Sequence, residues 1–117
     1  MRILKVEPGK APYVKEMAEG LKAIQREVEG LFRPLSMGDG VILCCNDEGK
    51  LNGMQPNRRL GDDIICGPFF FVGDDHAGGF CSLTEEQIQR YTQVFQEPEQ
   101  FTGQEPELEP HIELYMW

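Results

Sequence analysis

The sequence predicts a small α+β domain, in which a mostly antiparallel sheet of about five strands is packed by two helices. Three features indicate this class. Apolar residues recur at helical spacing in two separate segments, and short apolar runs bounded by turn residues lie between them. The length of 117 residues suits a single hydrophobic core. The expected order is strand, helix, three strands, a brief fourth strand and a second helix, followed by an extended C-terminal arm.

The N-terminal part is expected to form one strand and one long helix. Residues 2–6 alternate charged and aliphatic side chains, which is typical of a short strand, and Pro8 and Gly9 end it. Pro12 suits a first helical turn. The helix is then marked by apolar residues at spacings of three and four, namely Val14, Met17, Leu21, Ile24 and Val28. Gly30 lies where a C-cap glycine would end this helix.

The middle of the chain is expected to form antiparallel strands. Residues 31–36 fit an edge strand, because Pro34 has no N–H to donate to a central ladder. A turn separates them from residues 41–45, which are typical of a buried strand. Residues 64–72 are the most apolar segment and predict a core strand, with a bulge or an exposed edge near Pro68.

The second helix has a well-marked start. After a brief strand at residues 80–82, Thr84 and Gln87 have the spacing of a capping box, with two glutamates between them. An apolar stripe then predicts a helix to about Gln96, and it consists of Ile88, Tyr91 and Phe95. Pro98 would end the helix.

These elements give one domain over residues 1–96 and an acidic, proline-containing arm over residues 97–117. Alternating apolar residues suggest that residues 111–117 dock as a strand or an extended segment. The net charge of −9 is unevenly distributed. Residues 1–60 hold ten of the eleven basic side chains and eight acids, whereas residues 61–117 hold one basic side chain and twelve acids.

The sequence also predicts the compartment. No apolar run approaches the roughly 20 residues of a membrane span, and the N-terminus has neither an apolar signal region nor a small-residue cleavage site. We therefore expect a cytoplasmic protein without a membrane partner. Four thiols and no disulfide are expected in that reducing compartment, from Cys44, Cys45, Cys66 and Cys81.

Several short motifs point to a family. They are Glu7-Pro8-Gly9 with Pro12, Glu48-Gly49-Lys50-Leu51-Asn52-Gly53, Asn57-Arg58, Asp63-Ile64-Ile65, Val72-Gly73 and Phe80-Cys81-Ser82-Leu83-Thr84. Together they resemble domain-of-unknown-function family 3846 over about residues 1–95. The resemblance implies a small protein of a bacterium, a bacteriophage or an integrated mobile element. That family has no established activity, so no catalytic residue is carried over.

The candidate ligand-binding site is residues 52–59, which are polar, rich in turn formers and expected to form a loop. It combines amide donors and acceptors with two guanidinium groups, which bind phosphate or carboxylate bidentately. The candidate residues are Asn52, Gln55, Asn57, Arg58 and Arg59. The competing interpretation is a structural loop, in which the asparagines cap turns and the arginines pair with acids such as Asp62 and Asp63. No Walker-type or dinucleotide-binding glycine pattern is present.

Metal and catalytic sites are not predicted. The chain has no Cys-x-x-Cys and no His-x-x-x-His pair, and the adjacent Cys44 and Cys45 would point to opposite faces of a strand. His76 and His111 are the available bases for a nucleophile, and neither lies in a recognisable motif. We therefore expect no cofactor and no metal, and we favour a protein that is not an enzyme.

The favoured function is that of a binding protein of a phage or mobile element. It would counteract host defence by sequestering either a small anionic, nucleotide-like ligand or a basic host protein, the latter through its acidic half. The alternatives are a small hydrolase or nucleotide-processing enzyme, and an acidic mimic of DNA that inhibits DNA-binding proteins. The negative charge argues against direct contact with nucleic acid. The exposed strand edges implied by Pro34 and Pro68 leave both a monomer and a homo-oligomer open.

Overall fold

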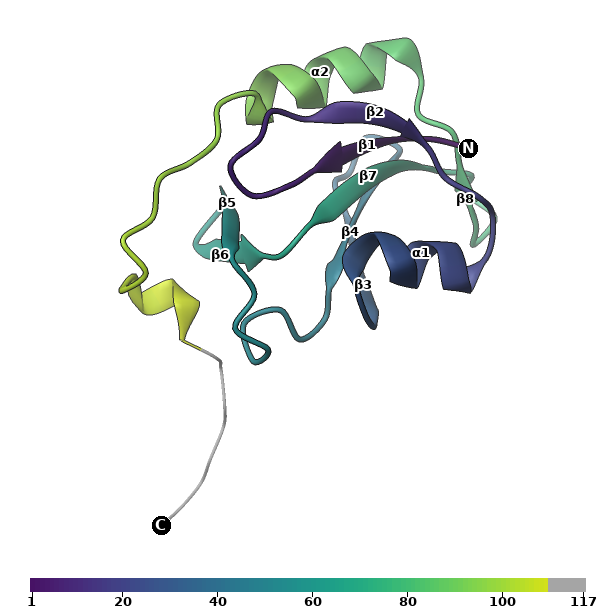
Figure 1. The fold of residues 1–117 in the computed structure, drawn as a ribbon. Helices are drawn as coiled ribbons and strands as arrows, with labels where there is room; N and C mark the ends of the chain where they lie inside the picture. Colours follow the sequence, from purple (N-terminus) through teal and green to yellow (C-terminus); the bar gives the residue numbers. More distant parts are fainter. Residues whose placement is uncertain (110–117) are drawn as a thin grey trace.

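The computed structural model describes residues 1–109, and an antiparallel six-stranded sheet lies at its centre (Figure 1). The elements in chain order are β1 (Arg2–Val6), β2 (Tyr13–Glu16), α1 (Leu21–Val28), β3 (Phe32–Ser36), β4 (Val41–Asn46), β5 (Pro56–Leu60), β6 (Asp63–Cys66), β7 (Phe69–Asp74), β8 (Phe80–Cys81), α2 (Glu85–Phe95) and the 3-10 helix η1 (Pro106–Leu108). The strands of the large sheet follow the order β2-β1-β7-β4-β3, and β8 also pairs with β7. The predicted α+β class is confirmed.

The two helices cover opposite faces of the sheet (Figure 1). Alternate residues of β7 divide between two apolar clusters. Phe69 and Phe71 pack with α2, whereas Phe70 and Val72 pack with α1. All four are fully buried, which explains why this segment is the most apolar of the chain. β5 and β6 form a separate hairpin on the α2 side, where Leu60 and Ile65 contribute to the same cluster.

The long N-terminal helix was predicted wrongly in its first half. Residues 13–16 form β2, which pairs antiparallel with β1 and places Val14 opposite Leu4. Val14 is 46% exposed, so its helical spacing from the later apolar residues does not reflect a shared buried face. Gly20 has a φ of 106° and lies just before α1, a conformation that a helix interior does not allow. The helix therefore begins at Leu21.

The core strand predicted over residues 64–72 is two strands that belong to different sheets. Gly67 has a φ of 87° and is followed by Pro68, so the chain turns between β6 and β7. β6 pairs with β5, and β5 occupies residues that the sequence placed in a polar loop. β5 was missed because it carries Asn57, Arg58 and Arg59 and therefore lacks an apolar pattern.

The other elements follow the prediction closely. β3 is an edge strand that contains Pro34, and β4 and β8 lie where expected. α2 has the predicted capping box: Gln87 N–H donates to the Thr84 hydroxyl at 3.1 Å, and Thr84 N–H donates to the Gln87 side chain at 2.9 Å. Among the described residues, no helix is long and apolar enough to cross a membrane.

The acidic arm packs on the domain as far as the structure describes it. Residues 97–109 run from the end of α2 past the β5–β6 hairpin, and η1 contacts β6 (Figure 1). The segment 111–117, for which docking was predicted, lies outside the described residues. All four cysteines are free thiols, and Cys81 is the one that is not fully buried.

Candidate functional site

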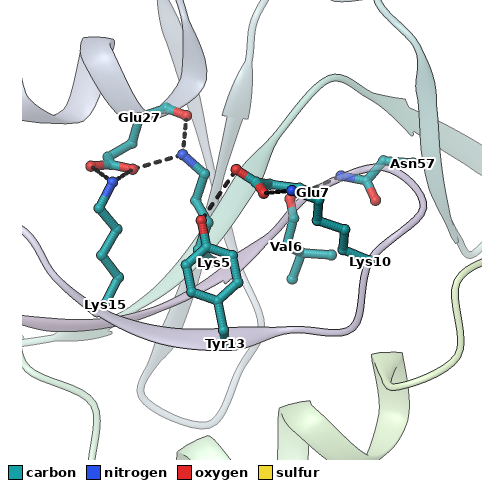
Figure 2. Close-up of polar contacts among 8 residues, drawn as sticks. All are labelled: Lys5, Val6, Glu7, Lys10, Tyr13, Lys15, Glu27 and Asn57. Carbon is teal, nitrogen blue, oxygen red and sulfur yellow. Dashed lines mark hydrogen bonds and ion pairs between the residues drawn. The ribbon is translucent and has the colours of Figure 1, made fainter.

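Asn57, one of the predicted ligand-binding residues, lies in the interior. Its amide nitrogen donates to the carbonyl oxygen of Val6 at 2.9 Å (Figure 2). The same nitrogen donates to the carbonyl oxygen of Gly67, also at 2.9 Å. The pairing of β5 with β6 shifts register between Pro56 and Arg58, which marks a bulge at Asn57. A bulge allows two consecutive side chains to point the same way, and here both point inward. Asn57 therefore ties the hairpin to the end of β1.

Arg58 is also buried, with 1% of its surface exposed. Its guanidinium donates to the carbonyl oxygen of Phe95 from Nε at 3.2 Å and from Nη2 at 3.0 Å. Nη2 also donates to the carbonyl of Lys10 at 2.6 Å, and Nη1 donates to the Asn57 side chain at 2.9 Å. Burial lowers the pKa of Arg58 below its ordinary value. This side chain joins α2, the β1–β2 connection and the hairpin rather than facing solvent.

Arg59 is exposed and holds the acidic arm. It forms an ion pair with Glu107, its backbone N–H donates to Glu99 at 2.9 Å, and its guanidinium lies 5.9 Å from the centre of the Phe101 ring. The hydrogen bond from Arg59 lowers the pKa of Glu107, so this acid stays charged. The sequence placed the partners of the arginines at Asp62 and Asp63, whereas the partners of Arg59 lie in the arm.

The remaining two predicted residues, Asn52 and Gln55, are exposed in the connection between β4 and β5. Gln55 lines a surface cavity together with Glu99 and Phe101 of the arm. Because Asn57 and Arg58 face inward while the other three side chains are exposed, the five residues do not form one continuous surface.

A cleft of about 310 Å³ lies beside this segment, between the turn after β4 and the β5–β6 hairpin. Its apolar lining comes from both sheets and consists of Leu35, Cys45, Leu51, Leu60, Ile64, Ile65 and Cys66. Its polar lining consists of Arg33, Asn46, Asp47, Glu48, Lys50 and Asp63. An apolar lining with a few polar and cationic groups is typical of a small-molecule site.

The turn that forms one wall of the cleft is fixed by Asn46. Its amide nitrogen donates to the carbonyls of Val28 and Glu29 at the end of α1, at 2.9 and 3.3 Å. Its amide oxygen accepts the Glu48 N–H at 2.8 Å, which begins the turn. Gly49 then lies so close to β6 that a Cβ there would be 2.5 Å from the Cys66 carbonyl oxygen. The hydrogen bonds of Asn46 and the close approach of Gly49 to Cys66 thus keep this turn packed against the β5–β6 hairpin.

Two cations, Arg33 and Lys50, line the cleft. Arg33 is exposed on β3 opposite Cys45, and it forms no ion pair with any residue between 1 and 109. Lys50 pairs with Asp63, which also accepts the Ile64 N–H at 2.8 Å. Burial alone would raise the pKa of Asp63, but the hydrogen bonds from Lys50 and Ile64 outweigh it and lower that pKa.

Arg33 and Lys50 were not among the candidate residues predicted from the sequence. The sequence contains only weak signals that these two residues would line a cleft. Arg33 and Leu35 alternate around Pro34 in the predicted edge strand, which places a cation and an apolar residue on one face. Lys50 lies inside the longest motif of the family resemblance.

The two thiols in the cleft have no sign of reactivity. Burial raises the pKa of Cys45 and of Cys66, so both remain protonated near neutral pH. Within residues 1–109, no group of three or more histidine, cysteine, aspartate or glutamate side chains is placed to hold a metal ion. The other polar groups of the cleft are charged and amide side chains that can form hydrogen bonds.

A second polar cluster lies on the α1 side of the sheet (Figure 2). Lys5 donates to the carboxylate of Glu27 at 2.6 Å and to its backbone carbonyl at 2.7 Å, and Lys15 pairs with the same carboxylate at 2.9 Å. Lys5 and Glu27 are both buried. Burial alone would raise the pKa of Glu27, but its lysine partners lower it. The charges of Lys5, Lys15 and Glu27 are thus paired with one another, and these ion pairs connect β1 and β2 to α1.

One family model matches the chain, and it covers residues 1–96. The model is described as "Domain of unknown function (DUF3846)". No curated protein and no solved structure matches the chain. The matched range ends where the acidic arm begins, so both cations of the cleft lie inside it and Glu107 lies outside it.

Proposed function

Because this chain belongs to the family of domains of unknown function DUF3846, whose description assigns no activity, we propose its function from the geometry of the cleft. The protein acts by binding, without catalysis, and the ligand is a small anionic molecule with an apolar or aromatic part. A nucleotide has this combination of groups. The phosphate would contact Arg33 and Lys50, and the base would lie against the apolar lining.

The observation that carries this proposal is that Arg33 lines the cleft without an ion pair to any of residues 1–109. An arginine that lines a cleft and lacks an ion pair within residues 1–109 can offer its planar fork of N–H groups to a phosphate. Lys50 lies beside the same cleft, and its partner Asp63 limits the excess positive charge. The exposed Leu51 and the half-buried Leu60 provide the apolar surface on which a flat ring could rest.

Asn57 and Arg58 support this cleft indirectly. They hold the β5–β6 hairpin against α2 and β1, and this hairpin forms one wall of the cleft. Asn52, Gln55 and Arg59 lie around it at the surface. The predicted polar segment thus adjoins the proposed site, while the main charged contacts come from β3 and from the turn after β4.

We extend the proposal to a biological setting on the basis of the family resemblance. A phage or mobile element benefits from a cytoplasmic protein that withholds a signalling nucleotide from host defence. Sequestration needs affinity and abundance rather than catalysis, which agrees with the protonated thiols of the cleft.

A basic host protein is the second candidate ligand. The supporting observation is that the arm packs on the domain, so that one cavity is lined by four acids, which outnumber its two cations, Arg33 and Lys50. The acids are Asp62, Asp63, Glu107 and Glu109. Such an acidic surface attracts basic partners, and the attraction weakens as salt is added. A complex that survives high salt, or that is unaffected by neutralising these acids, would count against this candidate.

Calorimetric titration with AMP, ADP, ATP, GMP and cyclic AMP tests the nucleotide proposal. We expect at least one of the five to bind the full chain, and Arg33→Gln to weaken that binding about tenfold, because a charge-assisted hydrogen bond is lost. Arg26→Gln is the matched control, since Arg26 is an exposed arginine on α1 that does not line the cleft. Equal affinities of the two variants would contradict the proposal.

A further inference from the structure

The acidic arm stands at the entrance of the proposed binding cleft. A second cavity, of about 560 Å³, shares Arg33, Lys50 and Asp63 with the cleft. Its other side is formed by the arm, through Pro106, Glu107 and Glu109. Two acidic residues of the arm therefore line the same cavity as the two cations that would hold a phosphate.

From this arrangement we propose that residues 97–109 act as a built-in competitor, which lowers the affinity of the cleft for anions and is displaced when an anion binds. This inference rests on the proposed function of the cleft. The carboxylates of Glu107 and Glu109 offset the positive potential at Arg33 and Lys50, so an approaching anion must overcome or remove them.

The attachment of the arm is suited to displacement. Its contacts with the hairpin gather around Arg59, which binds Glu107, Glu99 and Phe101. These contacts lie at the surface, where exposed ion pairs contribute little to stability. The short turn before η1 keeps its own shape, because Glu105 accepts the N–H groups of Thr102 and Gly103, each at 2.9 Å. The arm can thus detach and reattach as a preformed segment.

Thermodynamic linkage makes the effect reciprocal. If the docked arm weakens anion binding, a bound anion must weaken the docking of the arm by the same factor. The apparent affinity then depends on the fraction of molecules whose arm is away from the cleft. The family match covers residues 1–96, which include Arg33 and Lys50, and the arm follows it. The arm would therefore add control of the binding affinity to a domain that already contains both cations.

A pair of arm variants separates competition from a general effect of charge. Glu107→Gln removes the ion pair with Arg59 and one carboxylate at the entrance. Glu97→Gln makes the same change of charge at an exposed arm residue that has no hydrogen bond or ion pair with the rest of the described chain. Both are made in the full chain and titrated with the same five nucleotides. We expect Glu107→Gln to bind about two- to fivefold more tightly than Glu97→Gln.

A spectroscopic measurement follows the arm directly. In ¹⁵N relaxation experiments on the wild-type protein, saturating nucleotide should increase the mobility of residues 99–109. If a nucleotide binds in an Arg33-dependent way, but Glu107→Gln and Glu97→Gln bind it equally and the arm relaxation is unchanged, the competitor role is overturned and the proposed function stands. If no nucleotide binds the wild type or either variant, both proposals fail.

Discussion

Arg58 and Phe95 join the hairpin to the last turn of α2. Two nitrogens of the buried guanidinium donate to one backbone carbonyl, at 3.2 and 3.0 Å. The carbonyls at a helix C-terminus carry partial negative charge, so they are favourable neighbours for a cation. A side chain predicted to bind a ligand is therefore a structural element that helps to shape the cleft.

Loss of the Arg58 guanidinium should destabilise the whole domain. Arg58→Met leaves the carbonyls of Phe95 and Lys10 without their donors, and we expect the free energy of unfolding to fall by about 3 kcal/mol. Arg59→Met, at the exposed neighbour, should cost much less unfolding free energy than Arg58→Met. Urea unfolding followed by circular dichroism compares the two. If Arg58→Met lowers the unfolding free energy no more than Arg59→Met does, Arg58 is not a structural residue.

Glu27 should make stability depend on pH. Its pKa is lowered in the folded protein, so its contribution is complete above the unfolded pKa, near 4.3, and is lost as the pH falls toward the folded pKa. Glu27→Gln should cost about 3 kcal/mol at pH 7, because it leaves the buried Lys5 without its carboxylate.

The pH series separates this effect from a loss of packing. The difference in unfolding free energy between Glu27→Gln and the wild type should shrink below about pH 4. Glu19→Gln, an exposed acid just before α1, should show no such trend. A constant difference across the pH range would mean that the charge of Glu27 is unimportant.

Tyr91 should titrate unusually late. Burial and the hydrogen bond to Asp39 raise the pKa of Tyr91 to about 12, and the hydroxyl lies 2.9 Å from the Asp39 carboxylate. Ultraviolet titration should show a tyrosine step near that pH, and Tyr91→Phe should remove it. Because the raised pKa belongs to the folded state, the stabilisation is present below pH 10 and is lost as the pH rises toward 12. A late step that persists in Tyr91→Phe would disprove the assignment.

Gly49 should be intolerant of a side chain. A Cβ at this position would lie 2.5 Å from the Cys66 carbonyl oxygen, so Gly49→Ala must push the turn away from β6. We expect a loss of about 1–3 kcal/mol in unfolding free energy and weaker nucleotide binding, since Lys50 lies on the displaced turn. Unchanged stability and binding would show that this wall of the cleft adapts freely.

Some elements could be predicted from local sequence signals. Others depend on contacts between distant parts of the chain and could not be predicted. The capping box of Thr84 and Gln87 fixes the start of α2 within a few residues, so the sequence alone identifies it. β2 depends on pairing with β1, and the spacing of Val14 from later apolar residues imitates a helix. β5 contains a bulge at Asn57, so its buried residues do not alternate with exposed ones.

The position of the candidate cleft could not be predicted from the sequence. The sequence indicates that arginines and amides gather in residues 52–59, and it does not show which of them turn inward. The cleft forms when the β5–β6 hairpin lies beside Arg33 of β3, which is a contact between segments far apart in the chain. Such a juxtaposition is a property of the folded chain.

Mapping of the bound nucleotide tests the central claim most directly. In ¹H–¹⁵N spectra of the full chain titrated with the five nucleotides, we predict saturable shifts for Arg33, for residues 47–51 and for Ile64, with smaller changes on the α1 face. The Arg33 side-chain Nε–H signal should move with the same dissociation constant. If all five nucleotides leave these signals unchanged, or move signals elsewhere on the protein, the cleft is not a nucleotide-binding site.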